Sequence, residues 1–287
     1  MPTNRPPQPV VTTVSIGNTS TTAITWSHLE AREFCPKLAD FAGLNSLANR
    51  LAAENKAAPI LIASVVPSSN AILLKLLKKK SRRPILIFRE DLAPKMEIIP
   101  EPAEKIGADR IASALGALTI NPATPWIVVD AGTALTCNAI QPARRGKPPC
   151  FEGGLIIPGA ALSLKALAAN TAQLPELNLA PAAAANLNFI GRCTAEAMRN
   201  GVMLAQAGAI LAMLKGQRAL LGPRTRVAIT GGGAEALLAV LKAIAPAASK
   251  GLRIYPLLAH LGLFSAWRSA EKLIGRISPS SRIGPMK

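Results

Sequence analysis

The sequence is poor in the residues from which aromatic surfaces and metal sites are built. Aromatic residues make up 3% of the 287 positions, so stacking platforms for single-stranded nucleic acid have few side chains to use. Histidine occurs only twice, at His28 and His260, and no two cysteines form a C-x-x-C pair, which leaves almost no ligands for a zinc site. We expect reduced thiols in a cytoplasmic protein; the cysteines are Cys35, Cys137, Cys150 and Cys193.

Long hydrophobic runs are also missing. The longest apolar stretch, residues 201–214, is shorter than the about 20 residues that cross a bilayer, and it contains Gln206. The first ten residues, MPTNRPPQPV, are polar and rich in proline, which is typical of a frayed arm rather than of a signal peptide. Hydrophobic residues still make up 49% of the chain. These features predict a soluble protein with a sizeable core in one large or two medium domains.

Acidic residues are scarce relative to basic ones, 16 against 33, and the net charge is +17. Such a charge points to an anionic metabolite or a nucleic acid as partner. Two clusters carry much of it, one at the end of an expected helix and one in an expected turn: Lys75, Lys78, Lys79, Lys80, Arg82 and Arg83, then Arg144, Arg145 and Lys147. A solvated surface and a nucleic-acid surface both fit, and the scarcity of aromatics favours the first.

The order of the expected elements indicates an α/β fold. Residues 10–26 alternate apolar and hydroxyl side chains around a Gly-Asn turn, as β-hairpins do. A helix near 40–54 follows, and the apolar runs at 59–67 and 84–88 suit buried parallel strands separated by a helix with a serine N-cap. We expect further helices at 101–118, 160–172, 192–216 and 233–246, a second hairpin from residue 126, and a strand entering a glycine turn at 226–233.

The second hairpin repeats the first. V-S-I-G-N-T-S-T at 14–21 and V-D-A-G-T-A-L-T at 129–136 place an apolar residue, Ser or Asp, glycine, and hydroxyl or amide residues in the same order. Two such hairpins, each opening an α/β unit, predict two similar lobes facing a cleft. We set the boundary at residue 120, with an N-terminal lobe over 1–120 and a C-terminal lobe over 121–287.

The glycine turns after strands are suited to phosphate. Glycine lets an anion approach main-chain N–H groups, and short hydroxyl side chains add donors. The second loop has Gly132, Thr133 and Thr136 for such contacts and Asp130 for a cation, although a simple turn with an aspartate fits equally well. The absence of G-x-x-x-x-G-K-[ST] excludes an ordinary P-loop. The third turn, TGGGAEA at 230–236, suits an adenine, a ribose or an anion, or is only a tight connection.

Two further stretches carry candidate chemistry. I-G-A-D-R at 106–110 places Asp109, a proton acceptor for an attacking hydroxyl, beside Arg110, a fork for a carboxylate; a surface ion pair is the alternative. E-G-G-L-I-I-P-G at 152–159 is consistent with a rigid cleft wall. In I-G-R-C-T at 190–194, Thr194 either caps a helix or points into the cleft.

The motifs taken together resemble those of the type III pantothenate kinases. In family order, the chain has SIGNT at 15–19, SVVP at 64–67, GADR at 107–110, DAGTALT at 130–136, GGLIIPG at 153–159, GRCT at 191–194 and TGG at 230–232. These seven signatures cover nearly the whole chain. The resemblance implies two ribonuclease H-like lobes of the actin-like ATPase superfamily around a nucleotide cleft.

The resemblance also implies an activity: ATP-dependent phosphorylation of pantothenate to 4'-phosphopantothenate, the first step of coenzyme A synthesis. It implies Asp109 as the catalytic proton acceptor, and a homodimer that uses Mg²⁺ and a monovalent cation, K⁺ or NH₄⁺. The implied sites are pantothenate at Gly107, Ala108, Asp109, Arg110 and Thr194, ATP at Ser15, Gly17, Asn18, Thr19 and Thr133, and the monovalent cation at Asp130.

Two positions depart from the family pattern. Ser15 stands where the family has an acid in the first phosphate loop, and Pro100 stands where a tyrosine is frequent. A serine hydroxyl carries no charge and holds a magnesium–phosphate group less strongly. Two alternatives to an active pantothenate kinase therefore stay open: a catalytically weakened relative with a binding or regulatory role, and a different small-molecule kinase on the same fold.

Overall fold

The computed structural model describes residues 9–27, 31–34, 41–54, 58–178 and 187–274. Most of the proline-rich arm, the basic tail, His28 and Cys35 lie outside the described residues. The described chain forms two compact units. Unit 1 comprises residues 1–95, 106–119 and 259–287, and unit 2 comprises residues 96–105 and 120–258. Each unit is built from separate segments of the chain rather than from one continuous half.

Unit 1 has a five-stranded sheet with the strand order β3-β2-β1-β4-β5. Strands β1 and β2 form the predicted hairpin, β3 continues it in the antiparallel sense, and β4 and β5 run parallel to β1. The bounds are β1 (Pro9–Ile16), β2 (Thr21–Ser27), β3 (Ala31–Phe34), β4 (Ile60–Ser64) and β5 (Ile85–Ile87). The helices of this unit are α1 (Phe41–Ala53), α2 (Pro67–Lys80), α3 (Ala108–Ile120) and α8 (Leu258–Ile274).

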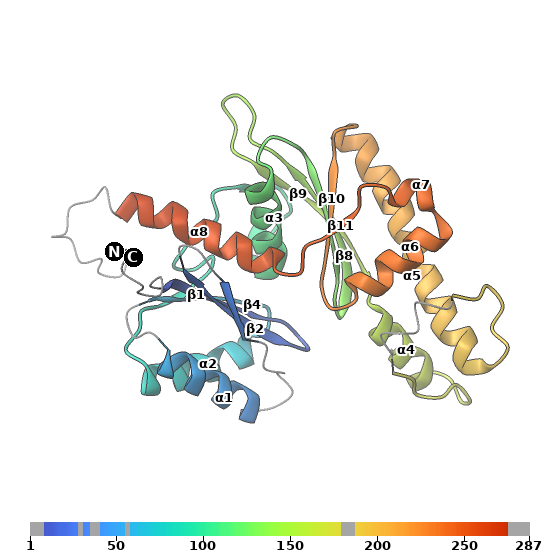
Figure 1. Cartoon of the computed structure of the whole chain (residues 1–287), viewed down its shortest axis with the longest axis horizontal. Coiled ribbons are helices and arrows are strands. Elements are labelled where there is room, and N and C mark those ends of the chain that lie inside the picture. The colour runs from blue at the N-terminus through green and yellow to red at the C-terminus, as the bar shows by residue number, and fades with distance from the viewer. Residues whose placement is uncertain (1–8, 28–30, 35–40, 55–57, 179–186, 275–287) are drawn as a thin grey trace, which may run out of the picture. The chain divides into compact units, whose positions relative to one another are not determined.

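The unit 1 sheet is covered on both faces (Figure 1). Val14, Ile16 and Ala23 point to one face, where they pack with α1 and α2 in a buried apolar cluster. On the other face, α8 approaches α3 so closely that a Cβ on Gly262 would overlap the main-chain carbonyl of Ala112. Because residues along a strand alternate between faces, the odd positions of β1 point towards α8.

Unit 2 has a six-stranded sheet with the order β11-β10-β7-β8-β9-β6. The run β9-β8-β7-β10-β11 repeats the order and strand directions of the unit 1 sheet, which confirms the predicted ribonuclease H-like lobes. The strands are β6 (Glu97–Ile98), β7 (Trp126–Ala131), β8 (Ala134–Gln141), β9 (Cys150–Pro158), β10 (Arg226–Thr230) and β11 (Arg253–Ile254). The helices are α4 (Ala160–Ala169), α5 (Thr194–Leu221), α6 (Ala234–Ile244) and α7 (Pro246–Ser249).

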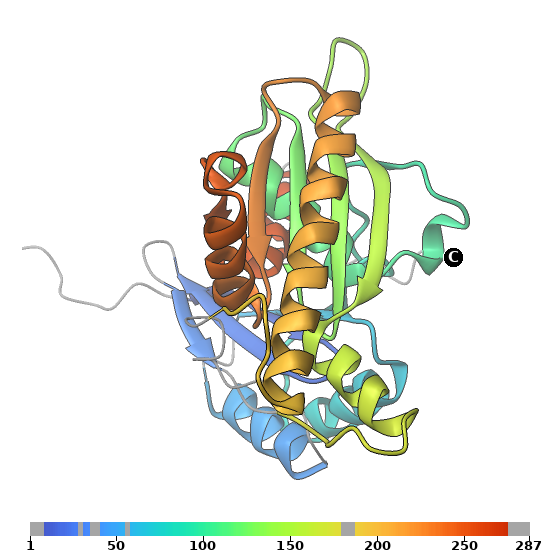
Figure 2. The ribbon, with the colours of Figure 1, turned by 90° about the vertical axis from the view of Figure 1, so that its right-hand side faces the viewer.

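Helix α5 is long and apolar enough to cross a membrane by length and composition. Its apolar positions Met203, Ala207, Ile210 and Leu214 instead pack in one buried cluster with β7, β8, β10 and α6. Figure 2 shows the helix lying along the sheet. The apolar run at 201–214 is therefore part of a longer core helix of unit 2.

Three local expectations were wrong. The helix expected over 101–118 begins at Ala108, after a separate 3-10 turn at Ala103–Lys105, because Gly107 interrupts the chain between them. The N-cap of α2 is Val66, since Pro67 takes the first helical position, so no serine caps it. Arg83 is 4% exposed and does not belong to the solvated basic cluster.

Arg83 is instead buried in unit 1, where its side chain joins several segments by hydrogen bonds. Its guanidinium donates to the main-chain carbonyls of Leu51, Ala58 and Pro59 and to Oγ1 of Thr12. Burial lowers the pKa of Arg83 to about 10. A fixed fork with five N–H groups satisfies several acceptors at once, which explains why arginine occupies this position.

Candidate functional site

The first glycine loop lies between β1 and β2 in unit 1. The N–H of Gly17 donates to the carbonyl of Ser20 at 2.9 Å and closes the turn. Asn18 and Thr19 are exposed at its tip. Ser15 is half-buried near the end of β1 and is the direct cross-strand partner of Thr22.

The SVVP segment joins this loop to the rest of unit 1. The N–H of Val65 donates to the carbonyl of Ile16, the last residue of β1, at 3.0 Å. Oγ of Ser64 accepts the N–H of Val66 at 3.1 Å, which turns the chain into α2. The end of β1 is thus held from its parallel neighbour β4.

The GADR segment starts α3 and presents Asp109 in the first helical turn. A Cβ on Gly107 would lie 2.5 Å from Oδ1 of Asp109 and 3.4 Å from Cγ1 of Val65, so glycine makes room for the carboxylate. The same oxygen accepts the N–H of Arg110 at 2.7 Å. Asp109 and Arg110 are both half-buried, which separates this pair from an ordinary surface ion pair.

Burial dominates the electrostatics of Asp109. Desolvation raises the pKa of its carboxyl group, although the Arg110 N–H and the Arg110 charge both act in the opposite direction. Burial likewise lowers the pKa of the Arg110 guanidinium. A carboxylate with a raised pKa is a stronger base than a solvated one, which suits proton abstraction from a hydroxyl.

The second glycine loop lies between β7 and β8 in unit 2. Asp130 is half-buried and pairs across the ladder with Thr136. The N–H of Gly132 donates to the carbonyl of Ala134 at 3.2 Å, and the N–H of Gly159 donates to the carbonyl of Thr133 at 2.9 Å. The loop is therefore hydrogen-bonded to the last residue of the GGLIIPG segment.

The third glycine turn packs on Asp130. Gly231 has φ of +91°, and a Cβ there would overlap Oδ1 of Asp130 and lie 2.8 Å from the carbonyl of Ala131. The N–H of Gly233 donates to that Ala131 carbonyl at 2.8 Å, directly before α6. These bonds bring the DAG and TGG segments together within unit 2.

The oxygen groups at this place fit a hard cation better than a transition metal. Asp130 offers a carboxylate, and Ala131 and Thr136 add a carbonyl and a hydroxyl nearby in the chain. Potassium, magnesium and calcium take such oxygen ligands. Within the described residues, no group of three or more His, Cys, Asp or Glu side chains gathers as a metal cluster.

Thr194 is the first residue of α5 and is exposed; its neighbour Cys193 takes the N-cap position. The loop before the helix is held by Glu196, whose carboxylate accepts the N–H of Arg192 at 2.8 Å and Nδ2 of Asn188 at 3.0 Å. The Arg192 N–H, more than any other group, lowers the pKa of Glu196. Thr194 therefore does not cap the helix but begins it, directly after this loop.

Pro100, the second departure from the family motif, lies in unit 2. Its Cγ is 3.1 Å from where a Cβ would stand on Gly153, so its ring packs on the GGLIIPG strand. The expected reduced cysteines are free thiols at Cys137, Cys150 and Cys193. Burial raises the pKa of Cys137 to about 12, which makes its thiol unreactive.

The sequence alone did not reveal some polar residues near the candidate segments. Nδ2 of Asn200 and Nε of Arg199, on the second turn of α5, are buried without a hydrogen-bond partner within the described part of the chain. His260 of α8 is 3% exposed, and its ring contacts Thr13 on β1 and Thr22 on β2. None of the three belongs to a recognisable motif, and only the packing of the folded chain shows that they are buried.

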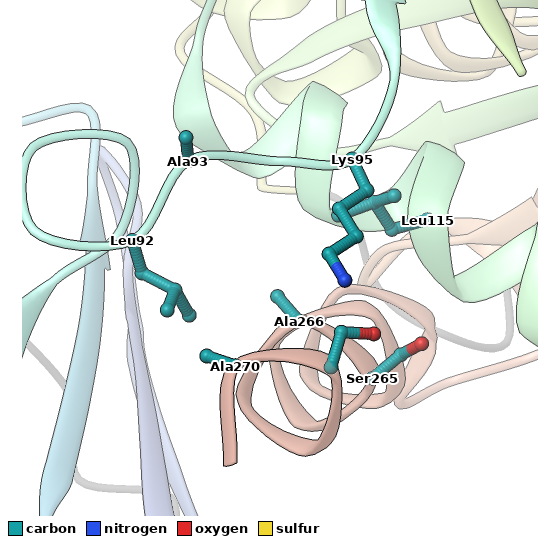
Figure 3. Close-up of a pocket in the computed structure, with 8 residues that line it drawn as sticks. Leu92, Ala93, Lys95, Leu115, Ser265, Ala266 and Ala270 are labelled. Atoms are coloured by element: carbon teal, nitrogen blue, oxygen red, sulfur yellow. The ribbon is translucent and has the colours of Figure 1, made fainter. Parts of the chain in front are cut away.

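A cavity of about 140 Å³ in unit 1 lies apart from these segments (Figure 3). It is lined mainly by small and apolar side chains from α3, α8 and the segment before Met96, with Lys95 at its edge. None of the candidate site residues lines it.

Comparison with known proteins agrees with the order of the motifs. A model of the type III pantothenate kinase family matches residues 12–216. The Type III pantothenate kinase of Thermus thermophilus is 32% identical over 232 residues, covering 78% of this chain and 88% of that protein. The one from Oleidesulfovibrio alaskensis is 34% identical over 179 residues, covering 62% and 65%, and the one from Cupriavidus pinatubonensis is 44% identical over 115 residues, covering 38% and 40%. The chain thus spans less than two thirds of the length of several of its curated relatives.

Solved structures support the fold. A putative 2-dehydro-3-deoxygalactonokinase from Sinorhizobium meliloti superposes with a TM-score of 0.52 at 16% identity, over 91% of this chain and 99% of that one. The activator of 2-hydroxyisocaproyl-CoA dehydratase from Clostridium difficile, with bound ADPNP, superposes with a TM-score of 0.50 at 12% identity, over 95% and 99%. The predicted actin-like ATPase architecture is confirmed.

Proposed function

The chain belongs to the type III pantothenate kinase family, and from that premise we propose that it transfers the γ-phosphoryl group of ATP to the primary hydroxyl of pantothenate. The product, 4'-phosphopantothenate, is the first intermediate of coenzyme A synthesis. The observation that carries the proposal is the carboxylate of Asp109, which Gly107 and the Arg110 N–H hold in place and whose pKa burial raises.

In this proposal Asp109 accepts the proton of the pantothenate hydroxyl as its oxygen attacks phosphorus. The guanidinium of Arg110 binds the pantothenate carboxylate, since a planar fork matches a carboxylate in two hydrogen bonds. Gly107 and Ala108 supply main chain to the substrate, and Thr194 adds a hydroxyl. Positioning and charge neutralisation provide most of the rate enhancement in phosphoryl transfer, so the fixed geometry of the GADR segment is what matters.

The ATP phosphates are assigned to main-chain and hydroxyl donors of the two glycine loops. Ser15, Asn18 and Thr19 supply one set, carried by the turn that the Gly17 N–H closes, and Thr133 supplies the other. Mg²⁺ would neutralise phosphate charge during transfer. The carboxylate of Asp130 would hold K⁺ or NH₄⁺, and its support by the main chain of Gly231 favours one fixed position.

We further propose a cytoplasmic homodimer. Large apolar side chains are exposed on unit 2, which a second copy would cover: Leu155, Ile156, Leu162, Phe189 and Ile190. Sedimentation at micromolar concentration tests this: a monomer argues against the dimer. Nucleic acid is not assigned as a partner, because Arg83 is buried and the basic cluster is smaller than its sequence indicates.

The alternative function is that of a weakened relative that binds ligands without efficient turnover. Ser15 favours it, because a neutral hydroxyl replaces a negative charge in the first phosphate loop. Pro100 supports it less, since the ring is accommodated against Gly153.

The test is formation of phosphopantothenate from ATP and pantothenate with K⁺ over a wide range of Mg²⁺ concentration. We expect product from the wild type and a decrease in kcat of about 10²–10⁴-fold in Asp109→Asn. Glu90→Gln, which removes the same charge at an exposed position of unit 1, is the matched control and should keep its activity. Folded wild-type protein without product at any Mg²⁺ concentration would reject the kinase and leave the binding alternative.

A further inference from the structure

His260 connects the last helix of unit 1 to the first phosphate loop. It lies in the first turn of α8 and is buried. Its Nδ1 is 2.9 Å from Oγ1 of Thr13 on β1, and its Nε2 is 2.7 Å from Oγ1 of Thr22 on β2. Both ring nitrogens therefore bond hydroxyl groups on the hairpin that carries Ser15.

We assign the direction of these hydrogen bonds from the distances around the Thr13 hydroxyl, which has one hydrogen to donate. The indole N–H of Trp26 can only donate, and it points to Oγ1 of Thr13 at 2.9 Å. The Thr13 hydroxyl then gives its own hydrogen to Nδ1 at 2.9 Å in preference to the carbonyl of Ile24 at 3.4 Å. With Nδ1 as acceptor, a neutral imidazole carries its hydrogen on Nε2 and donates it to Thr22.

The chain of hydrogen bonds ends beside Ser15. Thr22 is the direct cross-strand partner of Ser15, and such pairs have Cβ atoms about 4.5–5.5 Å apart on one face of a sheet. Because the Thr22 oxygen accepts from His260, its hydroxyl hydrogen is left to donate elsewhere. Burial lowers the pKa of His260 to about 4, so the ring is neutral at pH 7.

We propose that His260 is a positioning residue of the first phosphate loop: it orients the Thr22 hydroxyl as a second neutral donor, next to Ser15, for an ATP phosphate oxygen. The inference rests on the proposed use of this loop for ATP. It explains how the first phosphate loop binds an anion without an acid at position 15, because the hydroxyls of Ser15 and Thr22 act as two donors in fixed directions.

Two replacements of His260 separate positioning from packing. An asparagine amide reaches the place of Nδ1 and keeps the contact with Thr13, whereas a glutamine amide reaches the place of Nε2 and keeps the contact with Thr22. If His260 only supports packing, both variants affect ATP equally. If it positions Thr22, His260→Asn raises KM or Kd for ATP by about tenfold or more, as losing a hydrogen bond to a charged group does, and His260→Gln stays close to wild type.

Thr22→Val supplies the matched control, because valine keeps the shape and removes the hydroxyl. We expect it to weaken ATP binding as much as His260→Asn, with no further loss when both changes are combined. ATP binding is measured by calorimetry in buffer without denaturant. Circular dichroism shows first that each variant is folded. Equal ATP affinities for His260→Asn and His260→Gln would overturn the inference, as would full additivity of the double variant.

Nitrogen NMR of ¹⁵N-histidine-labelled wild-type protein provides a test that needs no variant. The inference requires the Nε2–H tautomer of His260 at pH 7, and the Nδ1–H tautomer would overturn it. The two proposals also fail separately. A protein that binds ATP without phosphorylating pantothenate loses the kinase function, and the comparison of asparagine with glutamine still decides the role of His260. An active kinase with two equal variants loses only the inference, and wild-type protein that does not bind ATP overturns both.

Discussion

Acid should destabilise unit 1 through His260. The perturbation is a change from pH 7 to pH 5, and the relevant group is a buried imidazole whose pKa falls from 6.5 to about 4 on folding. Between these two values the unfolded chain binds a proton that the folded chain does not, so stability decreases as the pH falls. Above pH 6.5 the imidazole is neutral in both states and the free energy of unfolding is at its full value. Between pH 6.5 and pH 4 that free energy decreases progressively.

The size of the effect follows from the two pKa values. The full difference corresponds to about 3.4 kcal/mol, reached below pH 4, at about 1.36 kcal/mol for each unit of pKa. At pH 5 the same linkage gives a loss of about 2 kcal/mol relative to pH 7. Burial raises the pKa of the Asp109 carboxyl group, so protonation of Asp109 at lower pH increases the stability of the folded chain. This effect is the same in every variant compared and cancels in the comparison.

The assay compares wild type with His260→Gln in a Trp126→Phe background. Trp26 and Trp267 then report the unfolding of unit 1 in urea, since Trp126 is the tryptophan of unit 2. Wild type should lose about 2 kcal/mol more than His260→Gln between pH 7 and pH 5, because glutamine has no proton to bind. Parallel changes in the two proteins would refute the reasoning.

Three other predictions concern the remaining polar and glycine positions. Gly231→Ala should destabilise unit 2 by about 2–4 kcal/mol in urea unfolding, because positive φ and an overlap with Asp130 both oppose a Cβ, and should weaken the response of activity to K⁺; unchanged stability would contradict this reading of the turn. Arg83→Met should cost about 3 kcal/mol or more by leaving buried carbonyls unpaired, while retention on a nucleic-acid column stays the same; a marked loss of retention would return Arg83 to the basic surface. Ser15→Asp should raise turnover at low Mg²⁺ by about tenfold, as a charge-assisted contact replaces a neutral one, and an unchanged rate would show that the missing acid does not limit the reaction.

The glycine loops and the strands beside them could be predicted from the sequence, because each is determined by residues that are neighbours in the chain. The hairpin around Gly17, the strand before Gly132 and the order of the strands all follow from alternation and from glycine positions. The start of α3 was missed because Gly107, inside an otherwise helical pattern, acts as a boundary only when the Asp109 carboxylate folds back over it.

Contacts between segments that are distant in the chain could not be predicted from the pattern of apolar and polar residues. Arg83 follows a run of lysines and reads as part of it, yet its acceptors Leu51 and Ala58 come from other elements. His260 stands in an apolar stretch with no motif around it, and the hydroxyls it bonds lie more than 200 positions away. The two-residue strand β6 is too short for alternation to show, so its pairing with β9 appears only in the folded chain.

The return of the chain to unit 1 affects the order in which a ribosome can complete the two units. Unit 2 has all its residues once Leu258 is made, whereas unit 1 still lacks α8. Until then the partner of Ala112 at Gly262 and the imidazole between Thr13 and Thr22 are missing. Domains usually fold from the N-terminus during synthesis, but here the unit that begins first is finished last. Nascent chains arrested when Leu258 has left the ribosome and the rest of α8 has not should therefore hold a folded unit 2 and an incomplete unit 1.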